Sequence, residues 1–158
     1  MTSIKIDPKE LAVVLRKEDT RLRKAVTQAA NAAARRLKTF MVRETDRKGI
    51  TDRGIYKNSF VVNKNVVSNE APHAGIVEMG TRPHHVGKEG REALKLWCMR
   101  KLDLSEKEAE AASWAIAHKI AAVGTEGRYV FRDALQKAIA FYREELTRII
   151  KRNKGKKP

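Results

Sequence analysis

The segment Asn69-Glu-Ala-Pro-His-Ala-Gly-Ile-Val-Glu-Met-Gly-Thr81 combines the end of a strand, a short helical turn and a glycine exit. Pro72 disfavours helical backbone at the residue before it, which predicts an extended or turn conformation at Ala71. Gly80 permits a positive φ, at which a side chain would clash. Ile76 and Val77 are apolar anchors in this segment, and Glu78 is a single carboxylate beside them, in a bend that follows a strand.

A long amphipathic helix is predicted upstream of this segment. Asp7-Pro8-Lys9-Glu10 has the composition of a capping box with proline at the first helical position. At 1.5 Å per residue the helix would extend roughly 50 Å, so we expect a bend near Glu18-Asp19-Thr20 or an end that projects to a neighbouring subunit. Its apolar residues recur at helical spacing as far as about Arg43, and they are Leu11, Val14, Leu15, Leu22, Val26, Ala29, Ala33, Leu37, Phe40 and Met41.

Two β-branched runs, residues 59–63 and 66–68, predict a short hairpin. Ser105-Glu106-Lys107-Glu108 is a second capping box, and the helix that it begins should end at Gly124. Three helical faces are predicted after the hairpin: Ala93, Leu94, Trp97 and Cys98; then Ala109, Ala112, Ile116, Ile120 and Val123; then Phe131, Leu135, Ala138, Ile139, Tyr142, Leu146, Ile149 and Ile150.

These elements predict an α+β fold. A long N-terminal helix and a C-terminal helix pack on a small, mostly antiparallel sheet, and a helical insertion lies between them. We expect residues 1–150 to form one domain and residues 151–158 to form a basic tail, because 158 residues suit a single core.

Composition restricts the partners of the chain. Lys and Arg number 34 against 19 Asp and Glu, which gives a formal net charge of +15. Such an excess favours association with polyanions. The lone Cys98 predicts a buried, reduced thiol, and the absence of a secretory signal or of an eighteen-residue apolar run predicts a cytoplasmic product with no membrane partner.

A second patch, Gly124-Thr-Glu-Gly-Arg-Tyr-Val-Phe-Arg-Asp-Ala-Leu135, is a glycine-rich turn that runs into the last predicted helix. Together with residues 51–59, the two patches resemble the signature of a tailed-phage neck family, the tail-completion or head-tail joining proteins of lambdoid siphophages. His73 stands where that family has tyrosine, and Asp133 replaces the proline that opens its last helix. The resemblance covers residues 51–82 and 124–135.

The resemblance implies a structural virion protein that is assembled in the host cytoplasm. Six or twelve copies would form a ring in the neck of the particle, which completes the tail or joins it to the head connector. Its partners would be other neck, connector, tail-terminator or tail-tube proteins. The expected interface and turn residues are His73, Ala74, Glu78, Gly80, Thr81 and Arg82 in the first motif, and Gly124, Gly127, Phe131 and Arg132 in the second.

Other chemistry has weaker support in the sequence. His84 and His85 are adjacent and lack a partner at helical spacing, so we expect loop histidines rather than a metal site. Gly124-x-x-Gly127 lacks the lysine and hydroxyl residue of a phosphate-binding loop, which favours a turn. We therefore expect no catalytic residues, no metal and no cofactor.

Glu78 has two interpretations of about equal weight. The carboxylate forms a local salt bridge with Arg82 that fastens the glycine turn, or it forms an ion pair across a subunit boundary. The sequence does not distinguish a partner in the same chain from one in a neighbouring chain.

The basic clusters also have two interpretations. Arg35, Arg36 and Lys38 form one cluster. They solvate a helix face, or they contact an acidic neighbouring ring or the DNA end held in the neck. A small nucleoid-type DNA-binding protein is the alternative function, because it would account for the net charge. The second cluster, near the C-terminus, contains Lys151, Arg152, Lys154, Lys156 and Lys157.

Overall fold

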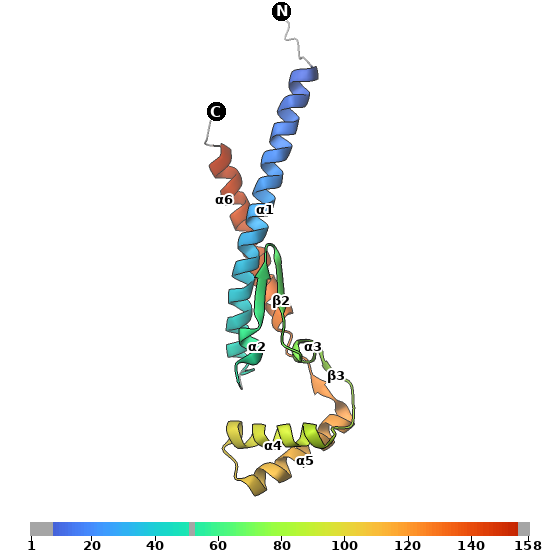
Figure 1. Cartoon of the computed structure of the whole chain (residues 1–158). Helices are drawn as coiled ribbons and strands as arrows, with labels where there is room; N and C mark the ends of the chain where they lie inside the picture. Colours follow the sequence, from blue (N-terminus) through green and yellow to red (C-terminus); the bar gives the residue numbers. More distant parts are fainter. Residues whose placement is uncertain (1–7, 51–52, 155–158) are drawn as a thin grey trace, which may run out of the picture. The chain divides into compact units, whose positions relative to one another are not determined.

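The computed structural model describes residues 8–50 and 53–154 (Figure 1). The helices and strands of these residues follow one another as α1 (Pro8–Arg47), α2 (Ile55–Asn58), β1 (Phe60–Asn63), β2 (Val66–Asn69), α3 (Ala74–Met79), β3 (Gly80–Thr81), α4 (Lys88–Leu102), α5 (Glu106–Val123), β4 (Thr125–Glu126) and α6 (Val130–Lys154).

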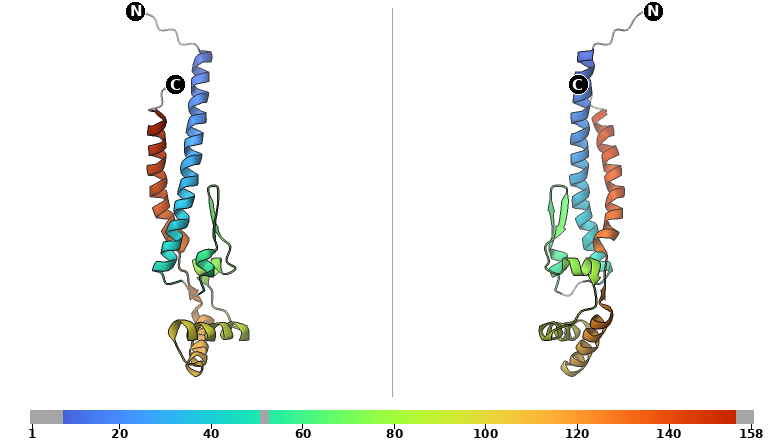
Figure 2. Two further views of the ribbon diagram at one scale, coloured as in Figure 1. Left: turned by 60° about the vertical axis from the view of Figure 1, so that its left-hand side comes forward. Right: turned by 90° about the vertical axis from the view of Figure 1, so that its right-hand side faces the viewer.

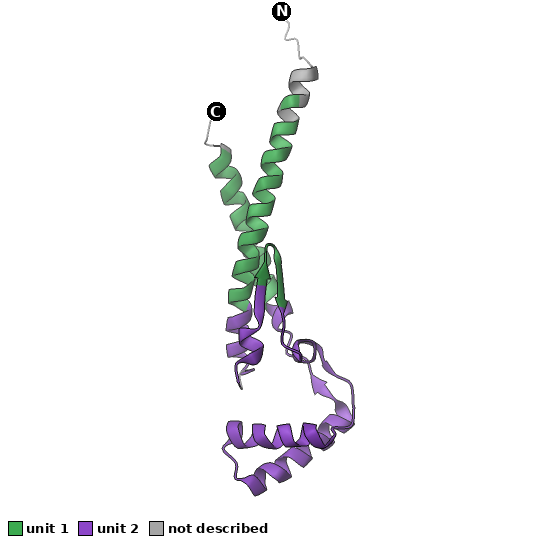
Figure 3. Ribbon diagram, viewed as in Figure 1, with its two compact units in different colours: residues 1–40, 62–68, 134–158 green, residues 41–61, 69–133 purple. Residues whose placement is uncertain are grey.

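The α+β class is confirmed, with a long N-terminal helix, a C-terminal helix and a helical insertion. Strands β1 and β2 form the predicted hairpin, and β3 and β4 form a second two-stranded sheet. The chain groups into two compact units (Figure 3). Unit 1 contains the described residues up to 40, residues 62–68 and the described residues from 134 onward, and unit 2 contains the described residues of 41–61 and 69–133. The single domain stays a prediction.

Helix α1 is one continuous element from Pro8 to Arg47, including the Glu18–Thr20 stretch. It ends four residues beyond the predicted end at Arg43. Its 40 residues correspond to about 60 Å at 1.5 Å per residue. Asp7 of the predicted capping box, and the side chains of the stripe residues Leu11, Val14 and Leu15, lie outside the described residues.

In unit 1, helices α1 and α6 lie side by side in every view (Figures 1 and 2). Their contact is built on Ala25, Ala29 and Ile149, none of which is more than 3% exposed. Leu22 and Val26, which the sequence predicts on the buried stripe, remain 51% and 38% exposed. That part of the prediction is wrong, because Ala25 and Ala29 occupy the α1 side of the contact, and the larger residues packed there, Tyr142, Leu146 and Ile150, come from α6.

The core of unit 2 is built around aromatic rings at the base of the hairpin. The ring centroids of Tyr56 and Phe60 lie 5.3 Å apart, and those of Phe60 and Phe131 lie 5.9 Å apart, both in edge-to-face arrangements. Met41 and Val130 are fully buried in the same unit. The start of the hairpin, the end of α1 and the start of α6 therefore contribute to one core.

Helices α4 and α5 form the predicted insertion between β3 and β4. The capping box at Ser105 is confirmed, with the Ser105 hydroxyl and the Glu108 carboxylate each bonding the other residue's backbone. The buried residues of the pair are Cys98 on α4, and Ala109, Ser113 and Ala117 on α5.

The predicted α5 stripe holds for Ala109, which is buried, and for Ala112, Ile116 and Ile120, which are half-buried, but not for Val123, which is 66% exposed. Trp97, which the sequence places on the same α4 face as Cys98, is 36% exposed. Small residues again occupy the contact between the helices, whereas larger apolar residues lie beside it.

Candidate functional site

The two motifs that the sequence singles out meet in unit 2. Gly80 pairs with Glu126 and Thr81 pairs with Thr125 in the antiparallel β3–β4 sheet. The hydroxyl oxygens of Thr81 and Thr125 lie 3.0 Å apart, and the Thr125 amide donates to the Thr81 hydroxyl at 3.2 Å. We call this sheet, with the glycines described next, the β3–β4 stem. The two strands of the stem lead into and out of the α4–α5 insertion.

Glycines make this close pairing feasible. Gly80 and Gly124 each end a helix, with φ of 75° and 74° and ψ of −165° and −156°. This region of backbone conformation is essentially restricted to glycine. A Cβ on Gly80 would overlap the Thr125 carbonyl oxygen, and one on Gly124 would overlap the Thr81 carbonyl oxygen. The positive φ predicted for Gly80 is confirmed.

Gly127 extends the contact toward α6. A Cβ on Gly127 would lie 2.6 Å from the Glu78 carbonyl oxygen, which is too close for a side chain. The Arg128 amide donates to the Val77 carbonyl at 2.8 Å, and the Tyr129 amide donates to the Glu78 carbonyl at 3.1 Å. The backbone of the first motif is thereby bonded to the chain immediately before α6.

Glu78 caps helix α6. Its two carboxylate oxygens accept hydrogen bonds from the backbone amides of Phe131 and Arg132, at 3.0 and 3.2 Å. These amides belong to the first turn of α6, where backbone donors lack a partner within the helix and the helix dipole favours a negative charge. The structure thus gives Glu78 a partner other than Arg82. Sequence reasoning missed this role, because the acceptor and its donors lie 53 and 54 residues apart.

Tyr56 lies beside this cap. Its side chain is buried, and its hydroxyl has no hydrogen-bond partner among the described residues. Burial, together with the nearby charge of Glu78, raises the pKa of Tyr56 to about 12. The ring of His73 lies 6.2 Å from the ring of Tyr56, just before Ala74 begins α3.

A cluster of charges surrounds the first turn of α6. Lys48 Nζ lies 2.7 Å from Asp133 Oδ2, and Arg132 Nε lies 3.2 Å from Asp133 Oδ1. The hydrogen bond from Lys48, followed by that from Arg132, holds the pKa of Asp133 below its ordinary value. The sequence places Asp133 in the first turn of a predicted helix, where the helix dipole favours an acidic side chain. Nothing in the sequence identifies Lys48 as its partner.

The remaining predicted residues lie outside the β3–β4 stem and the Glu78 cap of α6. Arg82 follows β3 and is exposed, and its carbonyl lies 2.9 Å from His84 Nδ1. His85 is also exposed. Lys151 and Arg152 lie exposed on α6, whereas the side chain of Lys154 and the whole of Lys156 and Lys157 lie outside the described part of the chain.

Across residues 8–50 and 53–154, no group of three His, Cys, Asp or Glu residues is placed to hold a metal ion. No helix in these ranges is long and apolar enough to span a bilayer. The expectations of no metal, no cofactor and no membrane partner stay expectations. No protein-family model, curated protein or solved structure matches the chain.

Proposed function

We propose that the protein is a structural virion protein of a tailed bacteriophage, whose copies form a ring in the neck that completes the tail or joins it to the head connector. The motifs of residues 69–82 and 124–135 suggest the class through their resemblance to neck proteins. The observation that carries the assembly role is the large number of apolar side chains that the folded chain leaves exposed.

The exposed apolar residues occur in both units. Monomeric soluble proteins expose single apolar residues, but apolar side chains that cluster on an element mark surfaces that a partner covers. On the α4–α5 insertion, Trp114 is 44% exposed and Leu102 is 51% exposed. Neighbouring copies or neck partners would cover these side chains. The other exposed residues of the insertion are Leu96, Trp97 and Val123; unit 1 exposes Leu22, Val26, Leu135 and Ile139.

The β3–β4 stem and the Glu78 cap support this role by tying the insertion to the rest of unit 2. A ring needs two different, complementary surfaces on each copy. The β3–β4 stem carries the α4–α5 helix pair, on which Trp97 and Trp114 are exposed, and Glu78 bonds the residues before the stem to α6. In this proposal Glu78 acts within the subunit. A contact across a subunit boundary would involve Arg82, His84 and His85 on the exposed loop instead.

The test uses a phage or prophage that encodes this chain. Deletion of the gene should leave separate heads and tails in electron micrographs, and a plasmid copy should restore joined particles. A copy with Trp97→Ser and Trp114→Ser should fail to restore them, whereas Lys101→Ser with Lys107→Ser, on the same helices, should succeed. Normal joined particles in the deletion strain would remove the proposal.

The alternative function, a small basic DNA-binding protein, is favoured by one observation. Unit 1 carries a net charge of +13, out of +15 for the whole chain. The two functions differ in their partners. Purified virions that contain the chain at a fixed copy number would favour the neck role, whereas recovery of the chain only on host or phage DNA outside particles would favour the alternative.

A further inference from the structure

The net charge of the chain is distributed unequally between the two units. Over the full sequence, the segments of unit 1 contain 19 of the 34 Lys and Arg residues and 6 of the 19 Asp and Glu residues, a net charge of +13. Unit 2 contains the other 15 basic and 13 acidic residues, a net charge of +2. Almost all of the excess positive charge therefore belongs to the unit built on α1 and α6.

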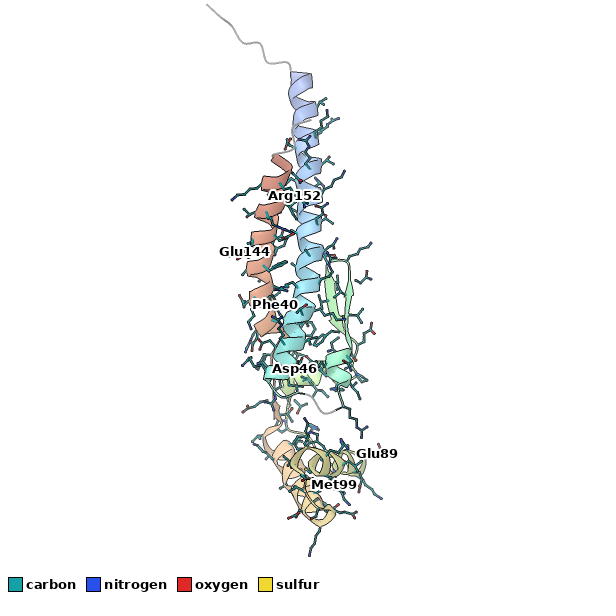
Figure 4. The ribbon with its side chains drawn as sticks, turned by 90° about the vertical axis from the view of Figure 1, so that its left-hand side faces the viewer. Phe40, Asp46, Glu89, Met99, Glu144 and Arg152 are labelled. Atoms are coloured by element: carbon teal, nitrogen blue, oxygen red, sulfur yellow. The ribbon has the colours of Figure 1, made fainter. Side chains whose placement is uncertain are left out.

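Basic side chains of unit 1 gather in two grooves. One groove is lined by Arg21 and Lys24 of α1 and by Arg152 of α6. The other is lined by Arg35 and Arg36 of α1 and by Arg148 of α6. All six side chains are exposed, and Figure 4 draws the side chains of both helices. We call these six residues the basic face.

Helical spacing places both grooves along the same side of the helix pair. The α1 positions that line them are 21, 24, 28, 32, 35, 36 and 39, and the α6 positions are 152, 153, 148, 145 and 141. Steps of three and four residues keep positions on one helix face. From Arg21 to Arg35 this face extends about 21 Å at 1.5 Å per residue.

Few acidic groups compete on this face. Glu145 lines the second groove and is held by Arg148 at 2.7 Å. Glu18 is bonded to Arg21 at 2.8 Å. Arg36 is positioned by aromatic rings, because its guanidinium lies 5.3 Å from the centroid of Phe40 and 5.7 Å from that of Phe141. The face is therefore an extended row of cations, of which one is held in place by ring stacking.

We propose that the basic face binds the phosphate backbone of duplex DNA without reading its sequence. Five of its six cations are arginines, whose planar fork matches phosphate oxygens better than a lysine does. Duplex DNA offers one negative charge per roughly 1.7 Å of its axis, so a straight row of about 21 Å meets several phosphates at once. An acidic protein surface seldom presents charges at that density.

The inference does not rest on the proposed function, and its test uses the isolated chain without any phage component. Fluorescence anisotropy measures binding of a mixed-sequence duplex of about 25 base pairs between 50 and 200 mM NaCl. Each neutralised phosphate contributes about −0.9 to the slope of log K against log salt concentration. Two of the six cations are already ion-paired, so we expect a slope of roughly −3 to −5. Equal affinity for unrelated sequences is also expected.

Two triple variants each remove three positive charges, one from the basic face and the other from the α4–α5 insertion. Lys24→Gln, Arg35→Gln and Arg152→Gln together should weaken binding at least tenfold at 100 mM NaCl and reduce the slope by two to three. The control removes three exposed lysines from the α4–α5 insertion, as Lys101→Gln, Lys107→Gln and Lys119→Gln, and should change affinity less than threefold. Circular dichroism checks that both variants keep their helix content.

Three results would overturn the inference. Equal weakening by both triple variants would mean that net charge alone attracts DNA. An absence of binding by the wild-type chain at 50 mM NaCl would remove the DNA partner. Binding of poly-glutamate without binding of the duplex would assign the basic face to an acidic protein instead.

Discussion

At the scale of single residues, Glu78 has the widest structural effect. One carboxylate accepts two backbone hydrogen bonds from the first turn of α6, and the backbone carbonyl of the same residue accepts a third from Tyr129. A charged acceptor at a helix N-terminus is favoured by the unpaired amides and by the helix dipole. The side chain and the backbone of Glu78 therefore join α3 to Tyr129 and to the first turn of α6.

Replacing Glu78 with Gln tests the cap. The amide keeps the length of the side chain and one acceptor oxygen but removes the charge. We expect the free energy of unfolding to fall by about 1–2 kcal/mol, because hydrogen bonds to charged groups are about twice as strong as neutral ones. Urea denaturation followed by circular dichroism measures the loss. The control Glu70→Gln, at an exposed position, should change stability by less than about 0.5 kcal/mol. Equal effects of the two variants would contradict the cap.

Tyr56→Phe should leave stability at pH 7 unchanged or raise it by up to about 1 kcal/mol. The reason is that the buried hydroxyl has no protein hydrogen-bond partner among the described residues, so its removal sacrifices no bond. Thermal unfolding measures the effect. Tyr56→Ala should cost about 3–5 kcal/mol, because it deletes a ring that packs on Phe60.

The same tyrosine predicts a loss of stability at high pH. Its pKa is raised to about 12 from an ordinary value of 10.0. The unfolded chain therefore ionises first, and this contribution to stability is complete below pH 10 and is lost as the pH rises to 12. Denaturation series at pH 9, 10 and 11 should show a smaller decline in Tyr56→Phe than in the wild type. Parallel declines would mean that Tyr56 ionises equally in both states.

At the scale of helices and strands, contacts form where side chains are small. Ala25 and Ala29 of α1 supply small side chains in the contact with Ile149 of α6, and Ala109 and Ser113 of α5 supply them in the contact with α4. Glycines do the same between β3 and β4, where Gly80 and Gly124 leave room for the opposite carbonyl oxygens. Small residues on one side of each contact allow the backbones to approach.

Gly80→Ala should therefore destabilise the protein by at least about 2 kcal/mol. Strained backbone of this kind costs about 1–3 kcal/mol for a residue with a side chain, and the new Cβ would also overlap the Thr125 carbonyl oxygen. Gly87→Ala is the matched control, since its φ is −67° and no atom lies within 4 Å of the added Cβ. Differential scanning calorimetry of both variants provides the comparison, and similar melting temperatures would show that the β3–β4 stem does not require glycine.

At the scale of the whole molecule, the α4–α5 insertion is a separable element. Its helices pack on each other, and the chain enters and leaves it through the paired strands β3 and β4. The buried aromatic residues of unit 2, Tyr56 and Phe60, lie outside it. The insertion therefore contributes exposed apolar surface rather than the core that holds the rest of unit 2.

Excision of the insertion tests this separation. Replacing residues 82–124 with Asn-Gly would join β3 to β4 by a two-residue hairpin loop. We expect the shortened chain to unfold cooperatively, because its aromatic core and the Glu78 cap of α6 are unchanged. Circular dichroism during heating measures the transition, and size-exclusion chromatography should show less self-association than in the full chain. A shortened chain without a cooperative transition would show that the insertion is required for folding.

Much of the local structure was predictable. The long helices, the hairpin and the capping box at Ser105 follow from spacing and turn chemistry, and the positive φ of Gly80 follows from its place after a short helix, whereas helix α2 and the β3–β4 sheet were not predicted. The candidate site was predictable only as two separate motifs. Their pairing depends on Gly124 and Gly127 facing residues more than 40 positions earlier, and no local pattern specifies such a contact.

The sequence by itself determined the long helices, the β1–β2 hairpin, the net charge and the positive φ of Gly80, because these depend on neighbouring residues and on composition. Only the tertiary structure decided that Glu78 bonds to α6 rather than to Arg82, that Gly124 and Gly127 face residues more than 40 positions earlier, and that basic residues of α1 and α6 share one face. Each of these outcomes depends on how closely distant backbones approach, and that distance is set by the packing of all the side chains between them.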